Sequence, residues 1–215
     1  MSEHFPHPEM LQRHAYRERV LHWTIVLTFL FAAMSGLPLF HPALFFLSNL
    51  VGGAPWGALL HPFAGLAMAA VFAVFAVPLW RDNQIEPRDR QWLRQIKDVL
   101  GNHEERLPEV GKYNAGQKLL YLLMVLCMAT LVLTGFLIWR RYFSGYFPID
   151  AVRVALVAHA LAAFALVAGV IVHIAAAAWV RGSLGAMMRG KVTLGWAYKH
   201  HRAWFREMLR SGGER

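Results

Sequence analysis

Four histidines lie inside long apolar stretches of this 215-residue chain, where an ionisable side chain is costly to place. His159 and His173 share one stretch and stand 14 residues apart. That spacing is about 21 Å along a helix and leaves both within roughly 40° of one face. Because the hydrocarbon core of a bilayer is about 30 Å thick, one helix would present an imidazole near each membrane face. His22 and His61 lie in two other stretches, and together the four residues indicate a functional site.

The composition is typical of an integral membrane protein, because 57% of the residues are hydrophobic and only 16% are charged. The apolar residues gather in four blocks, each long enough to cross a bilayer as a helix. Continuously apolar blocks do not fit the alternating strands of a membrane barrel. The sequence therefore predicts an all-α, integral membrane four-helix bundle that forms one domain over residues 1–215. The predicted spans are residues 20–39, 56–80, 119–139 and 152–180.

The basic residues predict the orientation of these spans. Nineteen of the 22 Lys and Arg residues lie before the first span, in the loop 81–118 or in the tail 181–215. Only Arg140, Arg141 and Arg153 lie on the other side. The positive-inside rule then places both termini and the 81–118 loop in the cytoplasm. The net charge of +9 therefore reflects topology and not a nucleic-acid partner. Tryptophans near the span ends fit an interfacial belt: Trp23, Trp56, Trp80, Trp139 and Trp179.

In this topology the histidines form two pairs at two depths. His61 and His159 lie towards the periplasmic face, and His22 and His173 lie towards the cytoplasmic face. Two imidazoles that face each other across a helical bundle can be the axial ligands of a six-coordinate haem, which suits electron transfer and not oxygen binding. Zinc fits less well, since it favours a tetrahedral site and no acid or cysteine lies near. The only cysteine, Cys127, excludes a disulfide within the chain and a cysteine-ligated cluster.

Three glycines near these histidines, Gly36, Gly65 and Gly169, could leave room for a flat macrocycle. Close packing of helices through small residues explains them equally well. The remaining histidines lie in tails and loops and are expected to be solvated: His4, His7, His14, His41, His103, His200 and His201. One short amphipathic helix is expected at residues 91–100, on the cytoplasmic surface, and the tail contains another aromatic and basic stretch at residues 196–209.

The turn before the third span carries a second candidate site. Asn114 can cap the helix with Gln117 at its third position, in the manner of a capping box. The same residues offer donors to the carbonyl oxygens of a quinone headgroup, and Gly116 would allow close approach to the backbone. A capping role and a quinone-binding role both remain open at this point.

Motifs along nearly the whole chain resemble the cytochrome b (gamma) subunit of respiratory membrane-bound formate dehydrogenase. The run Gly111-Lys112-Tyr113-Asn114-Ala115-Gly116-Gln117-Lys118 is the most specific of them. The others are Leu21-His22-Trp23, Leu60-His61-Pro62-Phe63, Thr134-Gly135, Ile138-Trp139-Arg140, Tyr146-Phe147-Pro148, His159, His173, Trp179-Val180-Arg181-Gly182-Ser183 and Lys199-His200-His201. The chain departs from the family at Arg140-Arg141-Tyr142, where Arg-Pro-Tyr is more usual.

This resemblance implies two b haems with His22, His61, His159 and His173 as axial ligands. It also implies a menaquinone or ubiquinone site formed by Asn114, Gly116, Gln117 and His173. The implied partners are an iron–sulfur (beta) subunit and a molybdenum- or tungsten-pterin catalytic (alpha) subunit, in a heterotrimer that can assemble further. The subunit would lie in the bacterial inner membrane and carry electrons from the periplasmic iron–sulfur subunit to quinone at the cytoplasmic side. Formate itself would be oxidised on the partner, so this chain carries no catalytic residue for that step.

Other functions stay open on the sequence alone. The histidine spacing also fits a cytochrome b anchor of a nickel–iron hydrogenase or of another molybdoenzyme. A histidine-lined metal or proton transporter and an inert membrane anchor belong to different classes. Haem content after replacement of His159 would separate the transporter from the cytochrome, and a co-purifying catalytic subunit would name the complex.

Overall fold

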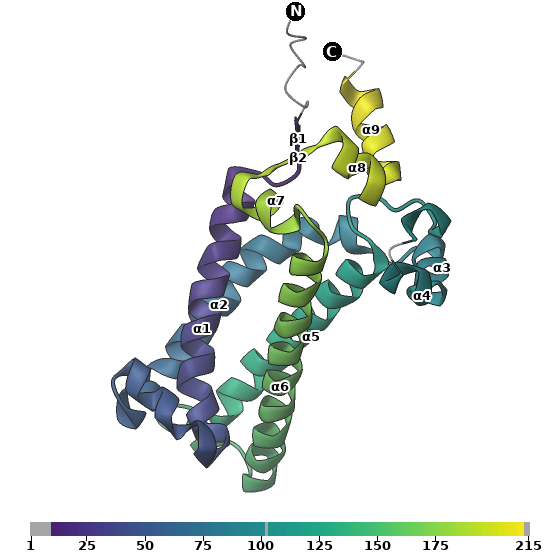
Figure 1. Ribbon diagram of the computed structural model, residues 1–215. Helices are drawn as coiled ribbons and strands as arrows, with labels where there is room; N and C mark the ends of the chain where they lie inside the picture. Colours follow the sequence, from purple (N-terminus) through teal and green to yellow (C-terminus); the bar gives the residue numbers. More distant parts are fainter. Residues whose placement is uncertain (1–9, 102, 213–215) are drawn as a thin grey trace, which may run out of the picture. The chain divides into compact units, whose positions relative to one another are not determined.

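The computed structural model describes residues 10–101 and 103–212, and its long elements are all helices. Four of them are long and apolar enough to cross a membrane, as the sequence predicts. Figure 1 labels these as α1 (Tyr16–Phe40), α2 (Ala54–Leu79), α5 (Ala115–Ile138) and α6 (Ile149–Trp179). Each begins a few residues before its predicted apolar block. Polar residues in the first turns of α1, α5 and α6 explain this difference there, since hydropathy marks the apolar part of a helix and not its start. In α2 the added residues are Ala54 and Pro55, and proline suits the first turn of a helix.

Shorter elements connect the long helices. A short antiparallel ribbon, which the sequence did not reveal, pairs β1 (Met10–Gln12) with β2 (Lys191–Thr193), with Leu11 opposite Val192. Single-turn or longer 3₁₀ segments are η1 (Pro42–Val51), η2 (Arg81–Asn83), η3 (Glu104–Arg106) and η4 (Ser144–Tyr146). Short α-helices are α3 (Pro87–Arg94), α4 (Ile96–Leu100), α7 (Ser183–Arg189), α8 (Leu194–His200) and α9 (Arg202–Gly212).

The chain divides into two compact units, each assembled from segments that are distant in sequence. The first unit comprises Met1–Arg19, Leu79–Leu122 and His173–Arg215. The second unit comprises Val20–Pro78 and Leu123–Val172, which are the greater parts of the four long helices. His61 and His159 both belong to the second unit, and Asn114 and His201 both belong to the first.

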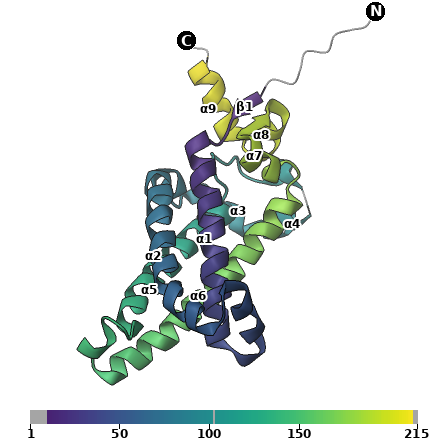
Figure 2. The ribbon, with the colours of Figure 1, turned by 90° about the vertical axis from the view of Figure 1, so that its left-hand side faces the viewer.

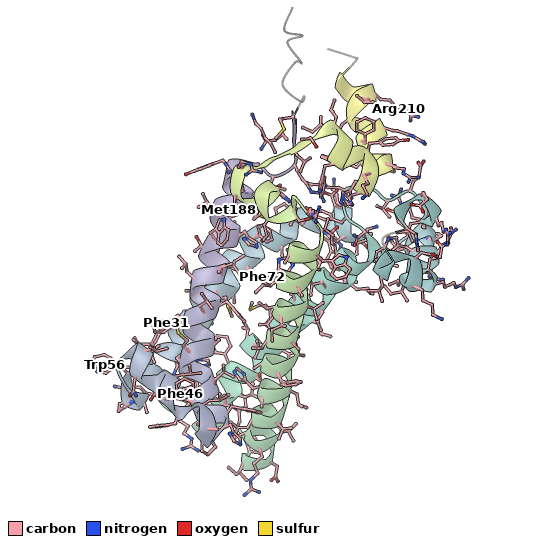
Figure 3. The ribbon with its side chains drawn as sticks, viewed as in Figure 1. Phe31, Phe46, Trp56, Phe72, Met188 and Arg210 are labelled. Atoms are coloured by element: carbon pink, nitrogen blue, oxygen red, sulfur yellow. The ribbon has the colours of Figure 1, made fainter. Side chains whose placement is uncertain are left out.

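The second unit has a small core and a large apolar exterior. Ala32, Met68 and Met128 form a buried cluster, against which Phe72 packs (Figure 3). Large apolar side chains such as Leu27 and Phe164 are instead about two-thirds exposed, at 69% and 67%. Exposed apolar side chains on long helices are what lipid contact requires, because lipid tails solvate them as well as a protein core does.

The first unit packs around two cores. One contains Ala186, Val192, Ala197 and Trp204, where α7, α8 and β2 meet. Figure 2 shows α7 and α8 beside β1, in agreement with the contacts of α8 with both strands. The second core consists of Trp92 of α3, Val110 of the segment that leads to α5, and Ala115, the first residue of α5.

The expected amphipathic helix at 91–100 and the aromatic and basic stretch at 196–209 are each divided between two helices. The 91–100 segment becomes α3, which begins earlier at Pro87, and α4, with the break at Gln95. Proline suits the first turn of a helix, and Glu86 and Asp89 complete a capping box there. The 196–209 segment is broken at His201, whose backbone (φ −146°, ψ 59°) is not helical.

Candidate functional site

His61 on α2 and His159 on α6 lie close together in the second unit. Their ring centroids are 6.3 Å apart, and the ring planes are inclined by 70°. Two imidazoles bound to opposite sides of one metal ion would have ring centres roughly 6 Å apart, because each metal–nitrogen bond is about 2 Å long. The separation therefore fits a pair of axial ligands.

The hydrogen bonds of His61 fix which of its nitrogens is available. Its Nδ1 lies 3.2 Å from the carbonyl oxygen of Ala32 and 3.1 Å from Oγ of Ser35. A carbonyl can only accept, so Nδ1 carries the proton and donates. The hydroxyl of Ser35 donates in turn to the carbonyl of Phe31, at 2.8 Å. Nε2 of His61 is thereby left with its lone pair, which is the form a metal ion binds.

His159 is held in the same way by a threonine. Oγ1 of Thr134 lies 2.9 Å from Nδ1 of His159. The threonine hydroxyl donates its own proton to the carbonyl of Thr130, at 2.6 Å, so it accepts from the histidine. Nε2 of His159 is again the nitrogen with the free lone pair. Both imidazoles thus have the tautomer and the outer hydrogen bond that metal-bound histidines show.

Two glycines stand directly beside this pair. A Cβ at Gly36 would lie 2.7 Å from Cε1 of His61, which no real side chain tolerates. A Cβ at Gly135 would lie 3.7 Å from Cε1 of His159. At Gly65 a Cβ would meet no described atom within 4 Å, and Gly169 is buried in α6. Gly36 is therefore required by His61 itself, while the open space at Gly65 fits the room that a macrocycle needs.

The other two candidate histidines belong to different units. His22 lies in the second unit, where its ring contacts Trp23 edge-on at 5.4 Å and Phe75 at 6.3 Å. His173 lies in the first unit, near the point where α6 passes from one unit to the other. Their pairing therefore remains a prediction from the sequence.

The residues around His61 and His159 fit a haem better than an isolated metal ion. Within residues 10–101 and 103–212, no three His, Cys, Asp or Glu side chains come together as a metal site. Two neutral imidazoles with free Nε2 atoms, flanked by glycines, match a planar group that supplies the other four ligands itself. These two residues would hold such a group, with Ser35 and Thr134 orienting them.

The turn at the start of α5 forms the predicted capping box. Oδ1 of Asn114 accepts from the backbone N–H of Gln117 at 2.9 Å, and Oε1 of Gln117 accepts from the N–H of Asn114 at 3.0 Å. Both bonds use the side-chain oxygens. The side-chain NH₂ groups take no part in them, so capping and donation to a quinone carbonyl are compatible.

Gly116 lies between these two residues and is exposed. A Cβ there would come to 3.4 Å from both Oδ1 of Asn114 and Cη2 of Trp92. Its N–H belongs to the first turn of α5, where backbone donors lack a carbonyl of the preceding turn. The turn therefore offers both side-chain and backbone donors at one end of the helix.

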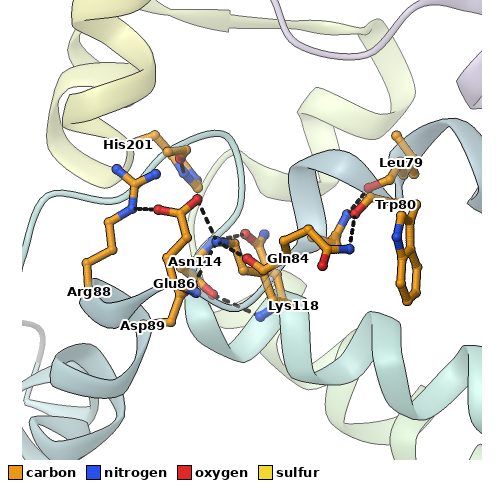
Figure 4. A network of polar contacts seen from close by, with 12 residues as sticks. Leu79, Trp80, Gln84, Glu86, Arg88, Asp89, Asn114, Lys118 and His201 are labelled. Atoms are coloured by element: carbon orange, nitrogen blue, oxygen red, sulfur yellow. Dashed lines mark hydrogen bonds and ion pairs between the residues drawn. The ribbon is translucent and has the colours of Figure 1, made fainter.

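A buried ion pair anchors this turn to α3 (Figure 4). Nζ of Lys118 lies 2.8 Å from a carboxylate oxygen of Asp89 and donates to the carbonyl of Gln84 at 2.9 Å. Lys118 and Asp89 are 3% and 1% exposed. The carboxylate of Glu86, which also pairs with Arg88, lies 3.6 Å from the same Nζ. A cation in the first turn of a helix opposes the helix dipole, so the acidic partners are what hold Lys118 there.

The expectation that the tail histidines are solvated is wrong for His201, which is 2% exposed and hydrogen-bonded on both ring nitrogens. His200 is partly buried, and its ring centroid lies 5.0 Å from that of Trp196, with the ring planes inclined by 47°. His41 and His103 lie in loops, while His4 and His7 fall outside the described residues.

Sequence reasoning missed the residues that orient the histidines. Ser35 and Thr134 are small polar residues in the middle of apolar spans, and that position is the signal that could have pointed to them. Arg13, which is 5% exposed, gave no such signal, because it reads as one more cytoplasmic charge. Gly135 stood in a recognised motif without an assigned role.

A protein whose long elements are all helices, with four potential membrane spans and a close histidine pair within them, has the architecture of a membrane cytochrome b. The sequence profile of prokaryotic cytochrome b561 matches residues 13–190, and the chain belongs to this family. It is 38% identical over 200 residues to "Formate dehydrogenase, nitrate-inducible, cytochrome b556(Fdn) subunit" of Escherichia coli K12, covering 93% of this chain and 92% of that protein. The "Formate dehydrogenase, cytochrome b556 subunit" of Haemophilus influenzae is 38% identical over 93% of this chain and 84% of its own length.

A third relative has a different name. The "Putative protein-methionine-sulfoxide reductase subunit YedZ1" of Azospira oryzae is 30% identical over 80% of this chain and 93% of its own length. The resemblance to formate dehydrogenase cytochrome b subunits is confirmed by these comparisons, and the family name implies haem b.

Proposed function

We propose that the protein is the di-haem cytochrome b subunit of a membrane-bound formate dehydrogenase and passes electrons across the inner membrane to a quinone. The close pair of His61 and His159, each with Nδ1 engaged and Nε2 available, is the observation that carries this proposal. His22 and His173 would hold the second haem. The formate dehydrogenase relatives, which align over nearly the whole chain, support the choice of complex.

Haem b bound by these histidines would supply one-electron transfer. Oxidation of formate to carbon dioxide on the catalytic partner would release two electrons and one proton. Two electrons and two protons then convert a menaquinone or ubiquinone to the quinol. With both termini in the cytoplasm, the His61–His159 side faces the periplasmic iron–sulfur and molybdenum- or tungsten-pterin subunits. Electron transfer towards the cytoplasmic side moves charge across the bilayer, at about 2.3 kcal/mol per charge per 100 mV.

The quinone would bind at the first turn of α5, near His173. Its carbonyl oxygens need donors, and the side-chain NH₂ groups of Asn114 and Gln117 and the N–H of Gly116 provide them. The exposure of Gly116 and Gln117 supports access to this turn. The same two side chains hold the helix start through their oxygens, so the donors are fixed in position before a quinone arrives.

The haem ligands can be tested by single replacements in the purified membrane complex. His61→Ala and His159→Ala should each remove the same haem, seen as loss of about half of the reduced-minus-oxidised b-type absorption. His22→Ala and His173→Ala should remove the other. His103→Ala, in a loop, serves as a control and should leave both haems. Full haem content in all four variants would reject the proposal in favour of a transporter.

The second candidate is the cytochrome b subunit of another redox complex. The 30% identity to a putative methionine-sulfoxide reductase subunit favours keeping it, and the same histidine spacing would suit a hydrogenase. The catalytic subunit that co-purifies decides between them. A molybdenum- or tungsten-containing partner that oxidises formate supports the first proposal, while a nickel–iron partner or a reductase rejects it.

A further inference from the structure

Residues 109–112, which lie directly before the turn that opens α5, form hydrogen bonds and an ion pair with other parts of the first unit, chiefly the C-terminal helices. The N–H of Ala203 donates to the carbonyl of Val110 at 3.2 Å. Nδ1 of His201 lies 2.8 Å from the carbonyl oxygen of Gly111. At the start of the segment, the guanidinium of Arg206 pairs with Glu109 at 2.8 Å. All of these residues belong to the first unit, so the arrangement is internal to it.

His201 is the centre of this attachment. Because the Gly111 carbonyl can only accept, Nδ1 of His201 carries the proton, and Nε2 accepts from Nη2 of Arg13 at 3.1 Å. Only a neutral imidazole can do both. Burial, followed by the charge of Arg13, lowers the pKa of His201 from 6.5 to about 3, which keeps the ring neutral at physiological pH.

Arg13 also bonds to Lys112, the residue that follows Gly111. The same Nη2 donates to the carbonyl of Lys112 at 2.8 Å, and the guanidinium lies over the rings of Trp196 and Trp204, at 4.9 and 5.2 Å. Its charge also acts on the neighbouring Tyr113 hydroxyl, whose pKa burial raises. The carbonyls of Val110, Gly111 and Lys112 are therefore all held from the C-terminal part or from Arg13.

The next residues along the chain are Tyr113 and Asn114, which lie directly before the first residue of α5, Ala115. Holding three consecutive carbonyls determines where the chain enters the helix, and hence where the donors of Asn114, Gly116 and Gln117 point. Misplacement of a binding group by 1 Å can cost a large factor in turnover or affinity.

We infer that His201 is a positioning residue for quinone: together with Arg13, it holds the Gly111–Lys112 segment so that the α5 turn presents its donors correctly. This inference rests on the proposed quinone site. His201 does not touch the substrate, and its effect passes through the Gly111 carbonyl. A quinone headgroup bound at the turn should therefore respond to changes in the tail.

The test uses the complete membrane complex with formate as donor and decylubiquinone or menadione as acceptor. His201→Leu removes both bonds of the ring and should raise the KM for the quinone about tenfold while kcat stays within about twofold. His201→Asn retains a donor for Gly111, and His201→Gln retains an acceptor for Arg13, so both should lie between Leu and wild type. Haem absorption should be unchanged in all three.

Phe205→Leu is the matched control, because Phe205 packs against the same tail core but makes no side-chain bond to residues 109–113 among the described contacts. Its KM should equal that of the wild type. An equal rise in KM for Phe205→Leu and His201→Leu would overturn the inference, since it would show that general loosening of the tail suffices. An unchanged KM in His201→Leu would overturn it too. If that variant fails to assemble, unchanged KM values in the Asn and Gln variants would do the same.

The proposed function fails in a different way. A wild-type complex in which formate-reduced haem is not reoxidised by either quinone would reject the quinone site altogether. Normal reoxidation in the wild type, together with a KM that is independent of residue 201, would reject only the role of His201.

Discussion

Thr134 and His159 are joined by a hydrogen bond of 2.9 Å in which the threonine hydroxyl accepts from Nδ1–H of the histidine. The hydroxyl can take this role because its own proton goes to the carbonyl of Thr130. The bond therefore sets the tautomer of His159 and the direction in which Nε2 points. Ser35 and the Ala32 carbonyl perform the same task for His61 from a different helix.

Thr134→Val should weaken retention of the haem proposed to bind between His61 and His159. Valine keeps the shape of threonine but cannot accept the Nδ1–H bond, and loss of such an outer partner typically costs about 10- to 100-fold in metal-site affinity. Titration of the purified protein with haem, followed by absorption spectroscopy, measures the loss. Thr134→Ser retains the hydroxyl and should bind as the wild type does. Equal affinity in the valine and serine variants would contradict this role for Thr134.

Gly36→Ala should disturb the same site by displacing His61, whereas Thr134→Val acts on His159. The added Cβ would lie 2.7 Å from Cε1 of His61, so the imidazole must move away from its present direction. We expect loss of the haem at this pair without loss of the other, measured by the intensity of the reduced b-type bands. Gly145→Ala, where a Cβ meets no atom within 4 Å, is the control. An unaltered spectrum in Gly36→Ala would show that His61 tolerates displacement.

The long helices could be predicted from the sequence because hydropathy is a local property and each span carries it independently. The candidate axial histidines followed from the cost of imidazoles in a membrane, which is also local. The contacts of Arg13 and His201 could not be predicted, since they join residues that are 188 positions apart. Nothing in the local sequence distinguishes a buried arginine under two tryptophans from the solvated cations beside it. The capping box of Asn114 and Gln117 could be predicted in part. Its spacing of three residues is visible in the sequence, but the sequence alone does not decide whether the same side chains also donate to a quinone.

Lys118→Met should destabilise the first unit more than loss of a surface lysine does. Asp89 would remain buried without its cation, and removal of one partner from a buried pair costs about 3–5 kcal/mol. Adding Asp89→Asn should restore part of this stability, because the amide keeps an acceptor for the Glu86 N–H without a charge. Thermal unfolding in detergent, followed by tryptophan fluorescence, measures both variants. Losses that simply add would show that Lys118 and Asp89 act independently.

The C-terminal helices α8 and α9 should open as the pH falls. Burial, together with the cations Lys199 and Arg13, lowers the pKa of His200 to about 4, and burial and Arg13 lower that of His201 to about 3. Both rings are neutral when folded, whereas the unfolded tail takes up protons below about 6.5. The stability that they contribute is therefore complete above pH 6.5 and declines as the pH falls towards 4 and 3.

Hydrogen exchange of the α8 and α9 amides, corrected for the intrinsic pH dependence, should show this opening between pH 7.5 and 5. The double variant His200→Gln, His201→Gln carries no titrating ring at these positions. Its exchange should depend less on pH, although it will be faster at pH 7.5 because a buried contact has been altered. A wild-type tail with the same corrected exchange at pH 7.5 and 5 would contradict the prediction.

Asn114→Asp separates the capping role of the α5 turn from the quinone-binding role proposed for it. The carboxylate keeps an oxygen for the Gln117 N–H and is favoured at a helix start, so the cap should survive. It lacks the NH₂ group, so a quinone carbonyl loses a donor and faces a negative charge instead. We expect a KM for decylubiquinone raised about tenfold or more, with normal thermal stability. Asn114→Ala loses the cap as well and should also be less stable by about 1 kcal/mol. If Asn114→Asp reduces quinone as the wild type does, Asn114 serves the helix alone, and the quinone donors must lie elsewhere.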